Sequence, residues 1–143
     1  MNVDRRRFIG VAAGAAVYAV LPGCASVAAT HVTPVDGAVR LTLQDFPQLL
    51  GPAGFLLLSP ARGPSPIYVL ALADGEYAAL SPVCTHLGCT VDVVGARLLC
   101  PCHGSTYDRE GNVLRGPAER ALRRFPVMLT SGGELVIRLE AAR

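Results

Sequence analysis

Two short segments carry most of the cysteine and histidine side chains in this sequence. The chain reads CTHLGC at residues 84–89 and CPCHGSTYD at residues 100–108, separated by ten residues without a Cys or a His. Four of the five cysteines and two of the three histidines lie in these segments. Each segment therefore contains two cysteines and one histidine, and in each the histidine has a cysteine two or three residues before it. The pairs are Cys84 with His86, and Cys100 with His103.

A Cys2His2 set has two chemical interpretations. One is a structural zinc ion, and the other is an iron–sulfur cluster with mixed ligation. Zinc would leave Cys89 and Cys102 without a role, and a Cys-x-His spacing is unusual for a zinc knuckle. A zinc-stabilised binding module is nevertheless kept as the hypothesis from another functional class.

The charge of the chain argues against a nucleic-acid-binding domain. The net charge of +2 comes from the N-terminal end, because ten Arg oppose ten acidic residues from Cys24 onward. Nucleic-acid-binding domains usually show a clear basic excess. Half of the residues are apolar, which is sufficient for a packed core in a chain of 143 residues.

The pattern from residue 37 onward predicts an all-β fold with antiparallel pairing. Short apolar or alternating runs are separated by Gly- and Pro-containing turns, and only residues 44–51 could form a short helix. Asp74-Gly75, Gly95 and Ser131-Gly-Gly are the expected hairpin turns. The expected strands cover 38–43, 54–59, 66–72, 76–80, 90–94, 97–100, 124–130 and 134–139.

Taken together, CTHLGC and CPCHGSTY resemble the two cluster-binding boxes of Rieske [2Fe–2S] proteins of the high-potential branch. The resemblance covers residues 81–119 strongly and the rest weakly. It implies a small Rieske-type β-sandwich or barrel over residues 37–143, with two cluster-binding loops in 81–119 and one [2Fe–2S] cluster. Residue by residue, it implies that Cys84 and Cys100 bind one iron, that His86 and His103 bind the other, and that Cys89 and Cys102 form a disulfide.

The resemblance also assigns residues around the cluster. Ser105 would donate a hydrogen bond to a bridging sulfide and Tyr107 one to the Cys84 sulfur, and both would raise the potential. Leu87 would be an apolar contact for a partner at the tip. Gly116-Pro117-Ala118 matches the family's cover loop, but Glu119 stands where quinol-oxidising members often have a second Pro. Four arginines lie close by in the sequence, and they are expected to form either a solvated face or a docking patch for an acidic redox partner: Arg115, Arg120, Arg123 and Arg124.

The N-terminal segment resembles an export signal. Residues 1–24 combine Arg5-Arg6 with an apolar run, as twin-arginine signals do. Cys24 in LPGC could be lipidated, residues 8–30 could remain as an uncleaved anchor, or cleavage after Ala28 could release the protein. Residues 25–36 are predicted to be a linker, with His31 as a solvated residue.

These features predict an exported electron-transfer protein at the periplasmic face of the bacterial inner membrane. The leading hypothesis is the iron–sulfur subunit of a quinol–cytochrome c reductase or related quinol-oxidising complex, with quinol, cytochrome b and cytochrome c or c1 as partners. Alternatives are the small subunit of a periplasmic molybdenum oxidase resembling arsenite oxidase, bound to its large subunit, and a stand-alone periplasmic carrier. No nucleic-acid partner is expected.

Overall fold

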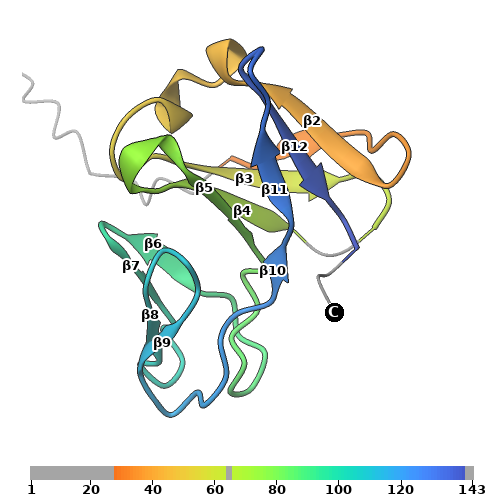
Figure 1. Ribbon diagram of the computed structural model, residues 1–143. Coiled ribbons are helices and arrows are strands. Elements are labelled where there is room, and N and C mark those ends of the chain that lie inside the picture. Colours follow the sequence, from red (N-terminus) through yellow and green to blue (C-terminus); the bar gives the residue numbers. More distant parts are fainter. Residues whose placement is uncertain (1–27, 64–65, 141–143) are drawn as a thin grey trace, which may run out of the picture.

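The computed structural model describes residues 28–63 and 66–140 of the chain. The expected signal segment and Cys24 lie outside these residues. Two sheets form the body of the molecule, and a third, smaller sheet forms a separate lobe at one end, below the body in Figure 1. No helix within the described ranges is long and apolar enough to cross a bilayer. The all-β prediction is confirmed.

The body is made of a five-stranded and a three-stranded sheet. The first has the strand order β1-β3-β4-β5-β10, and the second has the order β11-β12-β2. The strands of the first sheet are β1 (Thr30–Val32), β3 (Phe55–Pro60), β4 (Ile67–Ala71), β5 (Tyr77–Leu80) and β10 (Arg124–Phe125). The strands of the second are β2 (Ala38–Thr42), β11 (Val127–Leu129) and β12 (Glu134–Arg138).

Strand β4 lies between two hydrophobic cores. All five of its residues are buried. Side chains alternate along a strand, so Ile67 and Val69 enter the core of the body, whereas Tyr68 and Leu70 enter a second core under the site lobe. This double burial explains why the sequence shows an uninterrupted apolar run here and not an alternation. The strand thereby joins the lobe to the body.

The predicted hairpins are present. Strands β4 and β5 pair antiparallel around the turn at Asp74-Gly75, and β11 pairs with β12. Pro126 interrupts the expected strand 124–130, so that its first part is β10 on the other sheet. The expected helix at 44–51 is instead two short 3₁₀ turns, η1 (Leu43–Asp45) and η2 (Pro47–Leu49). A third such turn is η3 (Ala73–Gly75).

One part of the predicted linker is wrong. Residues Thr30–Val32 form β1, which pairs in parallel with β3 at the sheet edge. Thr30 and Val32 are β-branched and fit an extended backbone, and pairing satisfies the polar backbone groups of the β3 edge. An ordered strand therefore occupies Thr30–Val32 within the predicted linker. His31 is exposed, as predicted, although it lies on a strand.

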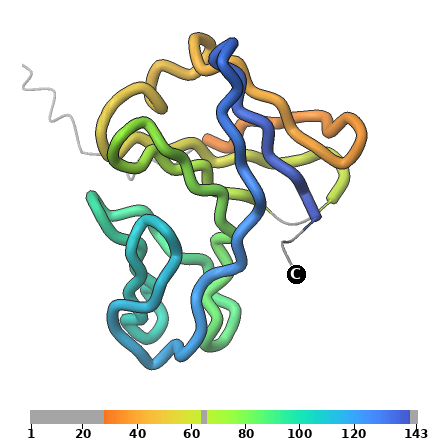
Figure 2. The backbone as a smooth tube through the Cα atoms, viewed as in Figure 1, coloured from red at the N-terminus to blue at the C-terminus, as the bar shows by residue number. Residues whose placement is uncertain are grey.

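The site lobe is a four-stranded antiparallel sheet of β6 (Asp92–Val94), β7 (Arg97–Leu99), β8 (Thr106–Tyr107) and β9 (Val113–Arg115), in this order. The continuous backbone trace in Figure 2 shows that it returns to the body through residues 116–124. Arg109 fixes the lobe to the body, because its guanidinium donates to the carbonyls of Gly95 (2.9 Å), Ala71 (3.1 Å) and Gly54 (2.6 Å). Burial lowers the pKa of Arg109.

Candidate metal centre

The two Cys/His loops have the same backbone geometry. In the first, the Cys84 N–H donates to the Cys89 carbonyl (2.7 Å) and the Gly88 N–H donates to the Cys84 carbonyl (2.9 Å). In the second, the Cys100 N–H donates to the Ser105 carbonyl (2.8 Å) and the Gly104 N–H to the Cys100 carbonyl (3.0 Å). Gly88 and Gly104 both have positive φ, at 81° and 77°, which favours glycine at these positions. Each loop thus curls around its first cysteine.

Of the four predicted ligand residues, the two histidines lie side by side and the two cysteines are buried. Cys84 and Cys100 are free thiols and are both only 2 % exposed. The rings of His86 and His103 meet edge to face with centroids 4.9 Å apart. His86 Nδ1 is buried without a hydrogen-bond partner, which is costly for a polar atom unless another group binds there. Two buried thiols, two adjoining imidazoles and one orphaned nitrogen fit a group with mixed thiolate and imidazole ligation.

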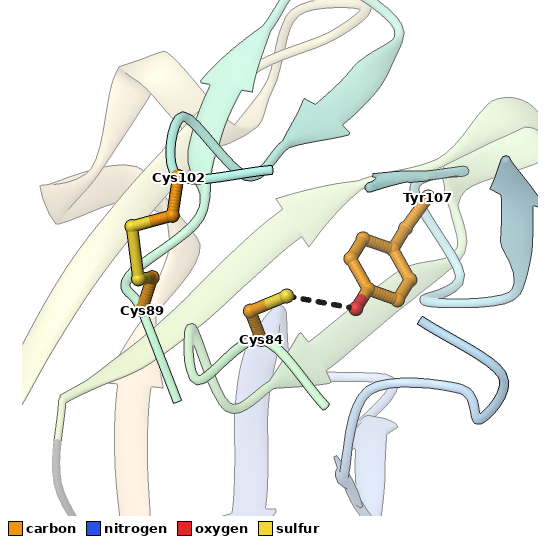
Figure 3. The surroundings of a disulfide bond; sticks show 4 residues. All are labelled: Cys84, Cys89, Cys102 and Tyr107. Atoms are coloured by element: carbon orange, nitrogen blue, oxygen red, sulfur yellow. Dashed lines mark hydrogen bonds between the residues drawn. A yellow bond between two sulfur atoms is a disulfide. The ribbon is translucent and has the colours of Figure 1, made fainter. Parts of the chain in front are cut away.

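A disulfide joins the loops. Cys89 and Cys102 are bonded, 13 residues apart in sequence, as the resemblance implied. Figure 3 shows that the Cys84 sulfur points away from this bond and toward Tyr107. The two loops are therefore held together by a covalent link that uses neither of the free thiols.

The Tyr107 hydroxyl lies at the centre of a small network behind Cys84. Its oxygen is 3.3 Å from Cys84 Sγ, 3.2 Å from the Thr85 N–H that donates to it, and 3.1 Å from Thr85 Oγ1. The Thr85 hydroxyl donates its proton to the Arg120 carbonyl at 2.6 Å. The Thr85 hydroxyl therefore cannot also donate to Tyr107, and the single Tyr107 proton is available to either Thr85 Oγ1 or Cys84 Sγ. A thiolate is the stronger acceptor of the two, so a ligating Cys84 would receive it.

This network changes the pKa of both partners. Burial raises the pKa of Cys84, but hydrogen bonds, the largest of them from Tyr107, outweigh it, and the net pKa is lowered. Burial first, and then the bond to Cys84, raise the pKa of Tyr107. Cys84 is therefore disposed to be a thiolate, which is the form that binds metal, while Tyr107 keeps its proton.

Ser105 ties the cover loop to the second Cys/His loop. It is fully buried, and its Oγ accepts a hydrogen bond from the Ala118 N–H at 3.0 Å. Its own proton is left to donate on the ligand side, where it contributes to lowering the pKa of Cys84. Donation to a bridging sulfide stays a prediction. Glu119 is exposed, while Ala118 is buried, so the cover loop is anchored without a second Pro.

The sequence analysis missed two residues of this region. Thr85 connects the first loop to Tyr107 and to the Arg120 carbonyl, and Arg109 anchors the lobe. The only sequence signal for a role of Thr85 is its position between the two predicted ligands Cys84 and His86. Leu87 is 69 % exposed at the tip, where the resemblance places a partner contact.

Comparison with known proteins decides the family. The model of the Rieske [2Fe-2S] domain matches residues 57–126. The cytochrome b6-f complex iron-sulfur subunit 2 of Synechocystis is 34 % identical over 157 aligned residues, covering 95 % of this chain and 84 % of that protein. The chain belongs to the Rieske [2Fe–2S] family. Its domain accordingly binds one [2Fe–2S] cluster, which favours that group over zinc.

Other Rieske proteins resemble shorter parts of the chain. The chloroplast cytochrome b6-f iron-sulfur subunit of Volvox carteri is 49 % identical over 69 residues, covering 46 % of this chain and 34 % of that protein. The subunit from Synechococcus elongatus is 44 % identical over 75 residues, covering 50 % and 42 %. This chain thus spans about a third to two fifths of the length of these relatives.

Solved structures agree with this assignment. The cyanobacterial plasma membrane Rieske protein from Synechocystis PCC 6803 has 31 % identity and a TM-score of 0.53, covering 59 % of this chain and 86 % of that one. A chain from the complex of reduced oxygenase and oxidised ferredoxin in carbazole 1,9a-dioxygenase has a TM-score of 0.59 at 20 % identity, covering 75 % of this chain and 97 % of that one. At that identity, the likeness supports the Rieske fold alone.

The first testable prediction concerns Tyr107. Tyr107→Phe should lower the midpoint potential of the cluster, because it removes a hydrogen bond that stabilises the reduced state. Such a bond contributes about 0.5–1.5 kcal/mol, which corresponds to a shift on the order of 20–60 mV. Protein-film voltammetry measures this. Tyr68→Phe is the matched control, since the buried Tyr68 hydroxyl donates to the Val91 carbonyl and not to a ligand. Equal potentials in wild type and Tyr107→Phe would contradict the tuning role.

Proposed function

We propose that Cys84, His86, Cys100 and His103 hold the [2Fe–2S] cluster and that the chain relays single electrons through it. When bound, the cluster takes up and releases one electron. The chain's own residues then have distinct roles. Cys84 and Cys100 are buried and therefore shielded from water. Tyr107 would donate a hydrogen bond to the Cys84 thiolate. The disulfide holds the two loops around the site.

The proposed partner is the quinol site of a cytochrome b-containing complex of the quinol–cytochrome c reductase type. One observation carries this proposal: Leu87 and His103 are both exposed. Leu87 directly follows His86, whose ring lies against that of His103. An exposed apolar side chain beside a redox site favours docking of an apolar partner surface. Several relatives named above are subunits of cytochrome b6-f complexes, which supports the same class of complex.

The proposed location is the periplasmic face of the bacterial inner membrane, after export by the twin-arginine route. Support comes from the sequence of residues 1–24, with lipidation at Cys24 as one mode of attachment.

A second candidate function is electron transfer to a water-soluble, acidic redox partner. The chain would then be either a stand-alone carrier or the small subunit of a molybdenum oxidase. The exposed Arg115, Arg120 and Arg123 favour it, because no ion pair involves them in the described chain. Glu119 in the cover loop also departs from the pattern of quinol-oxidising members.

Leu87 distinguishes the two candidates. Leu87→Ala should lower the rate of quinol oxidation in native membranes several-fold, because it removes the exposed apolar contact at the tip, while the reduced-state EPR spectrum stays unchanged. Leu50→Ala is the matched control: Leu50 is similarly exposed, at 62 %, but lies on the body. Cytochrome b should also co-purify with the tagged full chain.

The proposal of a quinol partner fails if Leu87→Ala oxidises quinol as fast as wild type and no cytochrome b co-purifies. If electron transfer to a soluble cytochrome instead slows with rising salt in wild type, and less so in Arg120→Gln, the second candidate is supported.

A further inference from the structure

Three sulfur atoms gather at the junction of the two loops. The Sγ atoms of Cys89, Cys100 and Cys102 all lie within 4.8 Å of one another. Two of them form the disulfide, while the third belongs to a free and buried thiol. A free thiol is thus held against a disulfide in the same molecule.

The other free thiol is placed differently. Cys84 is not part of the three-sulfur group in the described chain. Its sulfur is directed to the Tyr107 hydroxyl, on the side away from the disulfide (Figure 3). The two free thiols are equally buried, so only their position separates them. Cys84 is therefore an internal control for Cys100.

We infer that, in the cluster-free chain, Cys100 exchanges with the Cys89–Cys102 disulfide and is captured in a Cys89–Cys100 bond. The Cys100 thiol gives its proton to solvent, and its sulfur forms a bond to Cys89 Sγ as the Cys89–Cys102 bond breaks. Cys102 leaves as a thiolate and takes up a proton from solvent. One disulfide and one thiol are present before and after, so no oxidant or reductant is consumed.

The surroundings favour this product over the alternative. Cys102 is exposed, whereas Cys89 is half-buried, so the thiolate that leaves is the one that water can solvate. The alternative product, Cys100–Cys102, would close a ring across Pro101 alone, whose φ is fixed. Proximity makes the favoured exchange a unimolecular reaction that needs no thiol from solution.

The consequence concerns assembly of the site. This consequence rests on the proposed ligand role of Cys100, whereas the exchange itself does not. After exchange, Cys100 is no longer a thiolate and cannot bind iron, and Cys102 becomes an exposed thiol. Ligation of Cys100 by the cluster prevents the reaction. The chain therefore has to acquire its cluster before, or together with, formation of the Cys89–Cys102 disulfide.

Disulfide mapping of the full chain tests the exchange. Cluster-loaded protein is stripped of iron with a chelator under argon, and samples are taken over time. Free thiols are blocked with N-ethylmaleimide in acidic denaturant, the disulfide is then reduced, and the released thiols are labelled with iodoacetamide. Tandem mass spectrometry of the tryptic peptides ending at Arg97 and Arg109 assigns the labels. Stripped wild type is compared with Cys84→Ser and Cys100→Ser, which are purified without a cluster because each lacks a proposed ligand, and which are mapped directly.

We expect the maleimide label to move from Cys100 to Cys102 in stripped wild type, at a constant number of free thiols, and to lie on Cys102 in cluster-free Cys84→Ser. Cluster-loaded protein should not show this movement, and Cys100→Ser should lose it. A label that stays on Cys100 in stripped wild type overturns the inference, irrespective of how the variants fold. So does labelling of Cys102 that persists in Cys100→Ser. If the chain never contains iron and sulfide, the proposed function fails separately, and the same mapping still reports on the exchange.

Discussion

His103→Ala should give a folded chain that contains no [2Fe–2S] cluster. His103 is exposed, and its imidazole lies beside that of His86. The substitution therefore removes a proposed ligand of the cluster but leaves the packing of the hydrophobic core intact. Iron and acid-labile sulfide should fall from about two of each per chain to background, and the reduced-state EPR signal should vanish. The circular dichroism spectrum should keep its β-sheet form.

His31→Ala is the matched control, because His31 is an exposed histidine on β1, remote from the lobe. It should load iron and sulfide as wild type does. Cys84→Ser should behave like His103→Ala. A full complement of iron and sulfide in His103→Ala would remove this residue from the ligand set.

Loss of the disulfide should give a cluster that assembles but decays quickly. The cross-link spans 13 residues, and a bond closing a loop of this size contributes about 2–4 kcal/mol to stability. The double variant Cys89→Ser/Cys102→Ser is the suitable one, because either single variant leaves a free thiol beside Cys100. Its half-life of visible absorbance at elevated temperature should be much shorter than that of wild type.

Thr90→Ser, a conservative change at an exposed position next to Cys89, is the control and should retain the wild-type half-life. The guanidinium unfolding midpoint provides a second measurement. Wild-type values for both quantities in the double variant would mean that the disulfide does not stabilise the site.

The local motifs made the site predictable. Cys84, His86, Cys100 and His103 could be selected because their residue types and spacing restrict the chemistry. The structure places the two imidazoles side by side and buries the two thiols. The pairing of Cys89 with Cys102 came from the resemblance to Rieske proteins, since spacing alone does not fix a disulfide. The hairpins were predictable because Gly-containing turns are local signals.

Long-range contacts were not predictable in the same way. Strand β1 forms only because the edge of β3 is available to it, and nothing in THV distinguishes it from a linker. Nothing in the sequence distinguishes Arg109 from a surface arginine. In the fold, its guanidinium donates hydrogen bonds to three backbone carbonyls from segments that are distant in sequence. Thr85 gains its role from Arg120, 35 residues away. Such contacts depend on the finished fold.

The hydrogen bonds of Tyr107 and Ser105 have a consequence for how this protein can evolve. The Tyr107 hydroxyl contacts Cys84 Sγ and also accepts from the Thr85 backbone, and Ser105 is at once a neighbour of the site and the anchor of Ala118. A substitution at either residue changes the redox potential and the rigidity of a loop together. If a redox partner of lower potential were to favour a lower potential in this protein, substitutions should therefore accumulate at exposed positions of the lobe and not at Tyr107 or Ser105. A change of surface charge alters the redox potential of the site without removing a hydrogen bond that holds a loop.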